Sequence, residues 1–240
     1  MRHLLLDLDG PLMSFGGDMV DAYGVVRDFP AKSMIAGLLA NALGWERYEA
    51  ERHARLQERL VMGSARVGEG RRIRDFQTAQ LGGGDRGWTT RGRFEGRAGG
   101  ADTYKSPHIR YRDADADARV LVALRLYADE EEPTLDTIAA ALDRPERPLF
   151  LGRKPFLPSR PLCAGYVDAE TIREALAHGI TRIAPASSSS SVRGQWPVTK
   201  ELGPQDREEE LTDERHWPAG VHAGLRRVAE GPVGSVEATA

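Results

Sequence analysis

The chain has 240 residues, of which 40% are hydrophobic, enough to build the core of one large domain or two small ones. Its net charge is −3, and its single cysteine excludes an internal disulfide framework and a multi-cysteine zinc site. The opening apolar run is broken by Asp7 before it reaches the length of a signal peptide, and no stretch approaches the roughly 20 apolar residues of a membrane span. We therefore expect a cytoplasmic protein with no membrane partner.

Seven helices and strands are predicted from the spacing of apolar residues. Residues 3–9 alternate with period two, so that Leu4, Leu6 and Leu8 share one face of a strand. Residues 29–44 carry an apolar stripe at helical spacing that ends at Gly44. The predicted elements are a strand at 3–9, helices at 29–44 and 46–60, strands at 61–67, 72–79 and 119–127, and a helix at 134–142.

This order favours an α+β protein with a ferredoxin-like fold, in which a βαββαβ unit packs its helices on one face of a sheet and leaves the other face open. A doubly wound parallel sheet would need continuous apolar strands instead of alternating ones. We predict one domain over residues 1–184. Residues 185–197 contain a serine run and residues 203–214 are acidic, so 185–240 is predicted to be a linker and an irregular, partly flexible C-terminal extension.

Positive charge is concentrated in one part of this slightly acidic chain. Residues 55–112 carry 13 Lys and Arg against 6 Asp and Glu, and most of the basic residues are arginines. Arginine binds phosphate through paired hydrogen bonds and stacks on bases, and aromatic rings stack on bases too. The region is therefore either a solvated arginine-rich surface or a surface that binds nucleic acid. Its interspersed aromatic residues are Phe76, Trp88, Phe94, Tyr104 and Tyr111.

Residues 81–100 (LGGGDRGWTTRGRFEGRAGG) form an insertion with eight glycines and four arginines. Trp88 and Phe94 are its only large apolar residues, and its backbone entropy opposes folding on its own. The insertion is either a tolerated surface loop or a segment that a ligand orders.

Motifs for nucleotide, metal and acyl-transfer chemistry are missing from the sequence. Residues 82–87 (GGGDRG) lack the lysine of a phosphate-binding loop, and there is no GxSxG motif. The histidines are scattered, without the helical pairing typical of a metal site. Asp7 and Asp9 share a strand face, but Asp9 precedes Gly10-Pro11 and is explained more simply as a strand-end residue. We expect neither a cofactor nor a metal.

Three segments in this order and spacing resemble the CasD family, a subunit of the type I-E CRISPR surveillance complex Cascade. They are 4–16 (LLLDLDGPLMSFG), 29–44 (FPAKSMIAGLLANALG) and 148–162 (PLFLGRKPFLPSRPL). Residues 74–80 and 106–124 are also similar to the corresponding family segments. The resemblance covers residues 1–165 well and the rest of the chain weakly.

The resemblance implies a RAMP-superfamily protein with a ferredoxin-like, RRM-like core and a projecting β-hairpin, the thumb, here at about residues 80–112. Such a subunit caps the complex at the 5′ handle of the CRISPR RNA (crRNA). It lies beside a backbone subunit and the large subunit and meets target DNA only indirectly. A different subunit cuts the RNA in type I-E, so the resemblance implies a non-catalytic crRNA-binding protein of antiviral defence.

The first candidate RNA contact is the start of the predicted helix at 29–44. Lys32 and Ser33 lie where free backbone N–H groups favour an anion such as phosphate, and Arg27 lies just upstream. Alternatively, Ser33 only caps the helix and Lys32 is solvated. The family usually has threonine where this chain has Ala31, so a hydroxyl contact at that position is lost.

The second candidate is the LGRKP segment at 151–155, where a glycine beside two cations lets a sugar-phosphate approach backbone and charge together. The third is the thumb with its flanking strands, to which we assign phosphate contacts and base stacking. The candidate residues in these two regions are Gly152, Arg153, Lys154, Arg74, Arg91, Arg93, Arg110 and Arg112 for RNA binding, and Trp88 and Phe94 for stacking.

An alternative function is a metal-independent endoribonuclease that processes CRISPR repeat RNA, as a related subunit does in type I-C. Such an enzyme needs a general base for the 2′-OH and a cation for the phosphorane. Lys105 and His108 lie beside Tyr104, and Tyr23 is a further candidate, although Pro107 indicates a turn here. A scaffold that contacts only protein is disfavoured by the mixture of arginine and aromatic residues.

Overall fold

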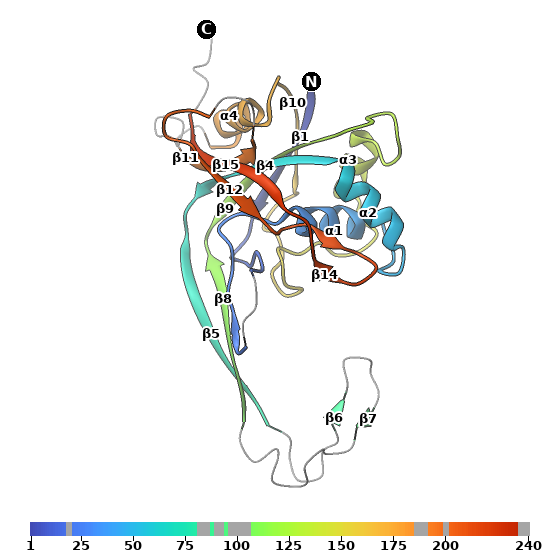
Figure 1. Ribbon diagram of the computed structural model, residues 1–240, viewed down its shortest axis with the longest axis vertical. Coiled ribbons are helices and arrows are strands. Elements are labelled where there is room, and N and C mark those ends of the chain that lie inside the picture. Colours follow the sequence, from blue (N-terminus) through green and yellow to red (C-terminus); the bar gives the residue numbers. More distant parts are fainter. Residues whose placement is uncertain are drawn as a thin grey trace.

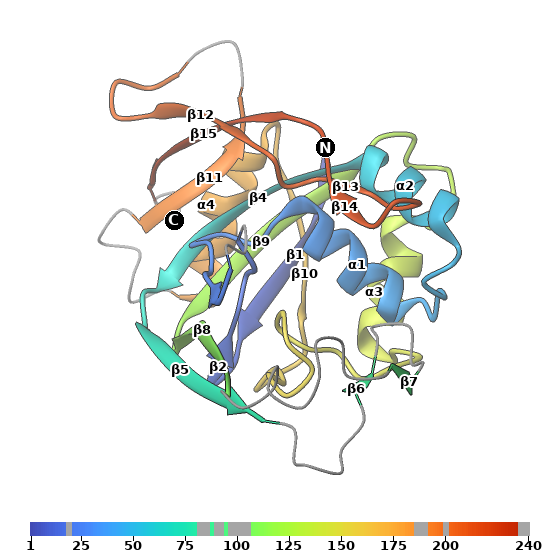
Figure 2. The ribbon, with the colours of Figure 1, turned by 60° about the horizontal axis from the view of Figure 1, so that its bottom comes forward.

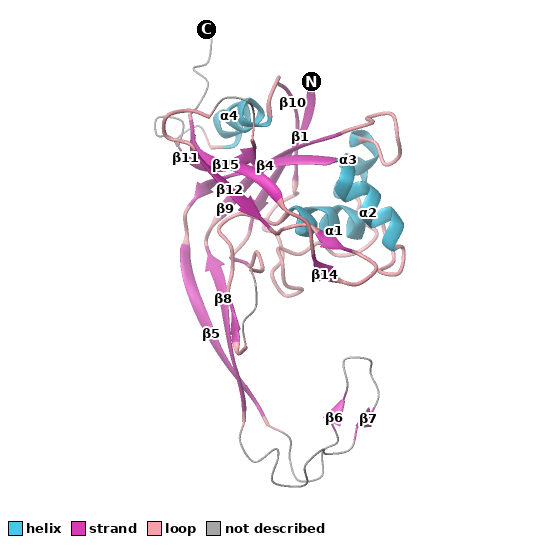
Figure 3. Ribbon diagram, viewed as in Figure 1, coloured by secondary structure: helices cyan, strands magenta, loops and turns pink. Residues whose placement is uncertain are grey.

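The structure, a computed structural model, describes residues 1–17, 21–80, 87–88, 94–95, 107–184, 192–198 and 202–234. Its centre is a seven-stranded sheet (Figures 1 and 3). The strands of this sheet are β1 (Arg2–Asp9), β4 (Leu60–Gly68), β9 (Arg119–Leu126), β10 (Cys163–Asp168), β11 (Val192–Pro197), β12 (Arg207–Leu211) and β15 (Arg226–Val233). Their order is β10-β1-β9-β4-β11-β15-β12, and all neighbours are antiparallel.

Four strands of this sheet and two helices form the predicted ferredoxin-like unit. Helix α1 (Lys32–Ala42) separates β1 from β4 in the sequence, and α3 (Leu135–Asp143) separates β9 from β10. The spatial order β10-β1-β9-β4 is that of a βαββαβ fold, so the predicted fold class is confirmed. A further helix, α2 (Ala50–Arg59), follows α1.

One face of the sheet packs against α1, α2 and α3. Leu4, Leu6 and Leu8 are fully buried there, as the period-two pattern predicts, and they share one apolar cluster with Ile35 of α1 and Ile138 of α3. The helix predicted at 134–142 is α3, and Thr134 is its N-cap, because the Thr134 side chain accepts a hydrogen bond from the backbone N–H of Thr137.

The opposite face is covered in part by a fourth helix, α4 (Ile172–Ile183), so the expectation of an open face is wrong (Figure 2). The reason is that Leu5 and Leu121 point to this side and are buried against Ile180. Gly179 lets the helix approach, because a Cβ there would lie 2.7 Å from a methyl group of Leu121. No helix in the described part of the chain is long and apolar enough to cross a membrane.

The C-terminal extension is not irregular, and this corrects the prediction for residues 185–240. β11, β15 and β12 continue the sheet beyond β4, so the sheet does not end at residue 184. Trp196, Ala229 and Val233 are buried on the α4 side. The glutamates of β12 lie on the edge strand, where Glu208 pairs with Arg227 of β15. Residues 185–191 and 235–240 lie outside the described residues.

A long hairpin projects from the sheet, as Figure 1 shows. β5 (Arg71–Ala79) and β8 (His108–Ala116) pair antiparallel along their full lengths, so the predicted thumb is a hairpin whose stem begins at residue 71 and ends at residue 116. Short strands β2 (Leu12–Met13) and β3 (Tyr23–Gly24) pair with β8. Gly70 leads into the hairpin at φ +60°, where a Cβ would lie 2.3 Å from the carbonyl oxygen of Ala116.

A network of ion pairs around the buried pair Arg66–Asp115 holds the foot of the hairpin. Asp115 is 2% exposed and accepts hydrogen bonds from Arg66 of β4 at 3.2 Å and from Arg72 of β5 at 3.0 Å. Asp28 accepts from Arg72 at 2.9 Å and from Arg193 of β11 at 2.8 Å. Burial alone would raise the pKa of Asp28, but its two arginine partners outweigh burial and lower it. The network ties hairpin, central sheet and C-terminal strands together.

Replacing Asp115 by alanine should destabilise the fold, because it removes the buried carboxylate partner of Arg66 and leaves that guanidinium only the exposed carboxylate of Glu69. Loss of one member of a buried pair costs about 3–5 kcal/mol of unfolding free energy. Urea denaturation should show this as a lower midpoint. Asp143→Ala is the matched control because Asp143 is exposed, and its midpoint should not change. Equal midpoints for both variants would contradict the role given to Asp115.

Candidate nucleic-acid interface

Three aromatic rings form a stack on one face of the hairpin. The rings of Tyr23 and Tyr111 are 5.0 Å apart and almost parallel, and the ring of Phe76 lies 5.5 Å from that of Tyr111. The stack follows from pairing, since Tyr111 is opposite Phe76 in β5 and next to Tyr23 in β3. Tyr23 is 47% exposed and Phe76 56%, so the stack presents apolar rings to solvent.

Arg74 lies on the same face as the ring stack. Its guanidinium donates two hydrogen bonds to Asp113, at 2.7 and 3.0 Å, and lies 5.8 Å from the ring centre of Tyr23. These hydrogen bonds raise the pKa of Arg74 and lower the pKa of Asp113. The guanidinium is thus held in a fixed position beside the rings while its side chain stays half exposed.

The opposite face of the hairpin carries Arg110 and Arg112, because side chains alternate along β8. Arg110 is exposed, and Arg112 donates to the side chain of Gln77 at 3.0 Å. The LGRKP segment joins them: Arg153 donates to the backbone carbonyl of Asp113 at 2.8 Å. Burial and the charge of Arg112 lower the pKa of Arg153. The structure therefore brings together three of the predicted arginines.

The backbone conformation at position 152 requires glycine. It adopts φ +93°, and a Cβ there would lie 1.8 Å from the carbonyl oxygen of Ser14. The segment is fixed because the N–H of Ser14 donates to the carbonyl of Leu151 at 3.0 Å. Lys154 is exposed, and within the described residues it has no ion-pair partner within 4 Å.

The start of α1, predicted to hold a phosphate, is occupied by the protein itself. The backbone N–H of Lys32 donates to the carboxylate of Asp213, and the N–H of Ser33 donates to its carbonyl oxygen, both at 3.0 Å. The Lys32 ammonium donates to Glu214 at 2.8 Å and is buried. Arg27 donates to the carbonyl of Thr212 at 3.2 Å. A phosphate here would have to displace Asp213.

The alternative for this helix start, a Ser33 cap and a solvated Lys32, is wrong. Lys32 is 8% exposed and is not solvated. Ala31 occupies the cap position, and no side chain caps the helix, so Ser33 does not act as a cap. The sequence could not indicate this arrangement, because Asp213 is 181 residues away from Lys32 along the chain.

Several predicted residues cannot be placed. Arg91, Arg93 and Lys105 lie outside the described residues. Trp88 and Phe94 are backbone partners in the short pair β6 (Gly87–Trp88) and β7 (Phe94–Glu95), but their side chains also lie outside the description. Their predicted contacts with RNA stay predictions.

Two of the residues named for the alternative nuclease, Tyr23 and His108, do not converge. Tyr23 stacks on Tyr111, whereas His108 lies three positions earlier in β8 and therefore belongs to the opposite face. Three residues of strand also separate the two positions by about 10 Å. Tyr23, considered in the sequence only as an acid–base group, is instead part of the ring stack. No sequence pattern around Tyr23 indicates that β3 pairs with β8, so the ring stack could not be predicted.

Comparison with known proteins places this architecture in a family. A family model described as CRISPR-associated protein (Cas_Cas5) matches residues 3–229. The chain belongs to the Cas5 family. This match covers both the ferredoxin-like unit and the C-terminal strands. A comparison with curated proteins found no match.

Two solved structures share the fold of this Cas5-family protein. A chain from a structure titled "CRISPR RNA-guided surveillance complex" is 23% identical with a TM-score of 0.69, over 97% of this chain and 90% of that one. A "Crystal structure of Cas protein" is 24% identical with a TM-score of 0.60, over 97% of this chain and 95% of that one. The likeness extends over 97% of the chain, which agrees with a C-terminal region that is part of the sheet.

Asp213 makes the stability of this Cas5-family protein depend on pH. Burial alone would raise its pKa, but the hydrogen bonds from Arg226 and from the N–H of Lys32 outweigh burial and hold the pKa below its ordinary value of 3.8. A carboxylate with a lowered pKa stabilises the folded state above its ordinary pKa, and this contribution is lost as pH falls through the folded-state value.

We expect Asp213→Asn to unfold at lower urea than the wild type at pH 7, with a loss of roughly 1–3 kcal/mol, the cost of a lost charged hydrogen bond. The difference should shrink as pH falls below 3.8. Urea denaturation at stepwise pH measures it, with the exposed Asp143→Asn as control. A difference that stays constant down to pH 3 would argue against an ionised Asp213 at the helix start.

Proposed function

We propose that this Cas5-family protein is a non-catalytic crRNA-binding subunit of a type I-E Cascade complex, which it caps at the 5′ handle. The observation that carries the proposal is the two-faced hairpin. One face presents the ring stack of Tyr23, Tyr111 and Phe76, and the other gathers Arg110, Arg112 and Arg153.

The two faces match the two chemistries of single-stranded RNA. Unstacked bases bind aromatic rings almost independently of sequence, and phosphates bind arginine. The ring stack is exposed, so bases can reach it without a rearrangement of the hairpin. Arg74 adds a fixed guanidinium plane at its edge. The charge of the second face predicts that binding weakens as salt rises.

The assignment to type I-E and the proposed partner subunits rest on the resemblance to the CasD family. The segments at 4–16, 29–44 and 148–162 support the type I-E form, and with it a backbone subunit and the large subunit as neighbours and indirect contact with target DNA. Family membership and the similar chain from a crRNA-guided complex support an assembly role. A nuclease is disfavoured because Tyr23 and His108 belong to opposite faces of the hairpin.

The first test uses the purified chain with 5′-labelled RNA of the cognate CRISPR repeat, in chelator, on native and denaturing gels. We expect intact RNA and a salt-sensitive shift that strengthens when the backbone subunit is added. A discrete cleavage product would establish a processing nuclease, with His108→Ala and Tyr23→Phe as the next variants. Intact RNA without a shift under either condition would leave only a protein-binding scaffold.

Phe76→Ala should weaken RNA binding about tenfold, because stacking on an aromatic ring contributes about 1–3 kcal/mol per base. The change removes an exposed ring, so the unfolding midpoint should stay near that of the wild type. Tyr48→Ala is the matched control, since Tyr48 is 83% exposed and has no place in the ring stack. Fluorescence anisotropy with labelled repeat RNA measures both. If the two variants bind equally well, the ring stack is not a base-binding surface.

A further inference from the structure

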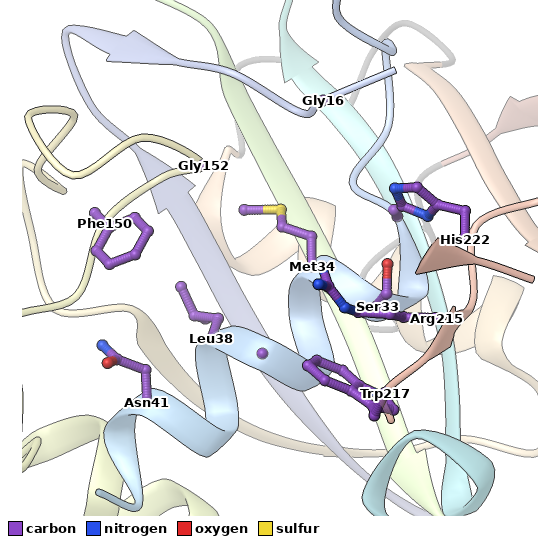
Figure 4. A pocket seen from close by; sticks show the side chains of 12 residues that line it. Gly16, Ser33, Met34, Leu38, Asn41, Phe150, Gly152, Arg215, Trp217 and His222 are labelled. Carbon is purple, nitrogen blue, oxygen red and sulfur yellow. The ribbon is translucent and has the colours of Figure 1, made fainter. Parts of the chain in front are cut away.

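A cavity of about 360 Å³ lies beside α1, beneath the short hairpin of β13 (Arg215–His216) and β14 (Val221–His222) (Figure 4). Its volume falls within the roughly 300–1,000 Å³ of small-ligand sites. Most of the lining is apolar, and a few polar groups lie at its edges. The side chains that the argument uses are Met34, Leu38, Phe150, Trp217, Arg215 and Asn41.

Arg215 supplies a positive charge to this cavity. Its backbone is held in place by Gln57, whose side chain accepts from the N–H at 3.0 Å and donates to the carbonyl at 3.2 Å. Its guanidinium lines the cavity 5.5 Å from the ring centre of Trp217 (Figure 4), and it has no ion-pair partner within 4 Å among the described residues. β13 thus holds the positive charge of Arg215 at the cavity, where it is available to a ligand.

Trp217 and Phe150 give the cavity flat walls. Trp217 is supported from behind by His53, with ring centres 4.6 Å apart. At the far end, the side-chain amide of Asn41 donates to the carbonyl of Pro148 at 3.0 Å. That bond orients the amide and leaves its oxygen as an acceptor for a ligand.

Gly37 keeps the cavity open from the middle of α1. Glycine weakens a helix interior, so its presence needs a reason. Close packing is not the reason for this glycine, because a Cβ on Gly37 would meet only Trp217, at an ordinary contact distance of 3.6 Å. Gly179 and Gly152, in contrast, have backbone or side-chain atoms too close for any Cβ. What a side chain at position 37 would obstruct is the cavity.

We propose that this cavity binds one unpaired nucleotide of the crRNA, with its base between Trp217 and Met34 and its phosphate toward Arg215. A base is flat, apolar on its faces and polar at its edge, which matches the flat walls and the amide of Asn41. This inference rests on the proposed function and names a base-binding site within it.

Continuity with the hairpin favours RNA over a protein side chain as the occupant. Gly152 lines the cavity, and the next residue, Arg153, donates to the backbone of Asp113 in β8. A strand of RNA that contacts Arg110 and Arg112 can therefore follow the LGRKP segment to the cavity. An apolar side chain of a neighbouring subunit would have no use for the charge of Arg215.

The test fills the cavity through Gly37→Leu, which replaces a poor helix former by a good one and should leave the melting temperature unchanged or higher. The probe is cognate repeat RNA, intact or with one abasic nucleotide at each handle position in turn. We expect the wild type to lose about tenfold in affinity at one position. Gly37→Leu should bind intact RNA about tenfold more weakly and lose nothing further at that position.

Arg215→Gln is the second variant, since it leaves the cavity walls in place, and it should also weaken binding of intact RNA. Arg144→Gln, which removes an equal charge from an exposed site, is the control and should bind as the wild type does.

If RNA binds the wild type and Gly37→Leu equally, the cavity is not a nucleotide site and the proposed function stands. If Gly37→Leu keeps RNA but loses a partner subunit, the occupant is protein and the proposal is wrong. If even the wild type binds no RNA, the proposed function fails first.

Discussion

The carboxylate of Asp115 is the point on which the placement of the hairpin depends. A two-stranded ribbon is at best marginally stable in water, and β5 and β8 extend well beyond the sheet (Figure 1). Asp115 joins both strands to the core, because it lies in β8 and binds Arg72 of β5 and Arg66 of β4. Asp28 then connects Arg72 to β11. Burial makes the charges of Arg66 and Asp115 costly to separate, and this pair fixes the direction in which the hairpin leaves the sheet.

The C-terminal strands fix the start of α1 through a second buried carboxylate, that of Asp213. β15 places Arg226 against Asp213, and Asp213 occupies the N–H groups at the start of α1. The segment that follows Asp213 forms one wall of the cavity beside α1 through Arg215 and Trp217. These residues therefore close one candidate anion site and create another pocket a short distance along the same helix.

The spacing of residues within a short segment predicted the helices and strands whose form depends on that segment alone. The period-two leucines of β1, the helix predicted at 134–142 and the strand predicted at 72–79 all follow from patterns among neighbouring residues. The parts that were missed depend on distant partners. Trp196 and Ala229 are buried in strands interrupted by glycine and charge, and Lys32 is neutralised by Glu214. A pairing between such remote residues leaves no periodic signal in a single sequence.

Pairing of charges gives the two faces of the hairpin different character in a chain of net charge −3. On the ring-stack face, Arg72 and Arg74 are each neutralised by a carboxylate of β8, so that face offers planes for stacking more than charge. On the other face, which also carries Asp75 opposite Arg112, Arg110 and Arg112 hydrogen-bond to neutral groups among the described residues. The alternation of side chains along two strands thus separates exposed rings from arginine charge. The proposed function assigns the bases of the RNA to the ring-stack face and its phosphates to the arginine face.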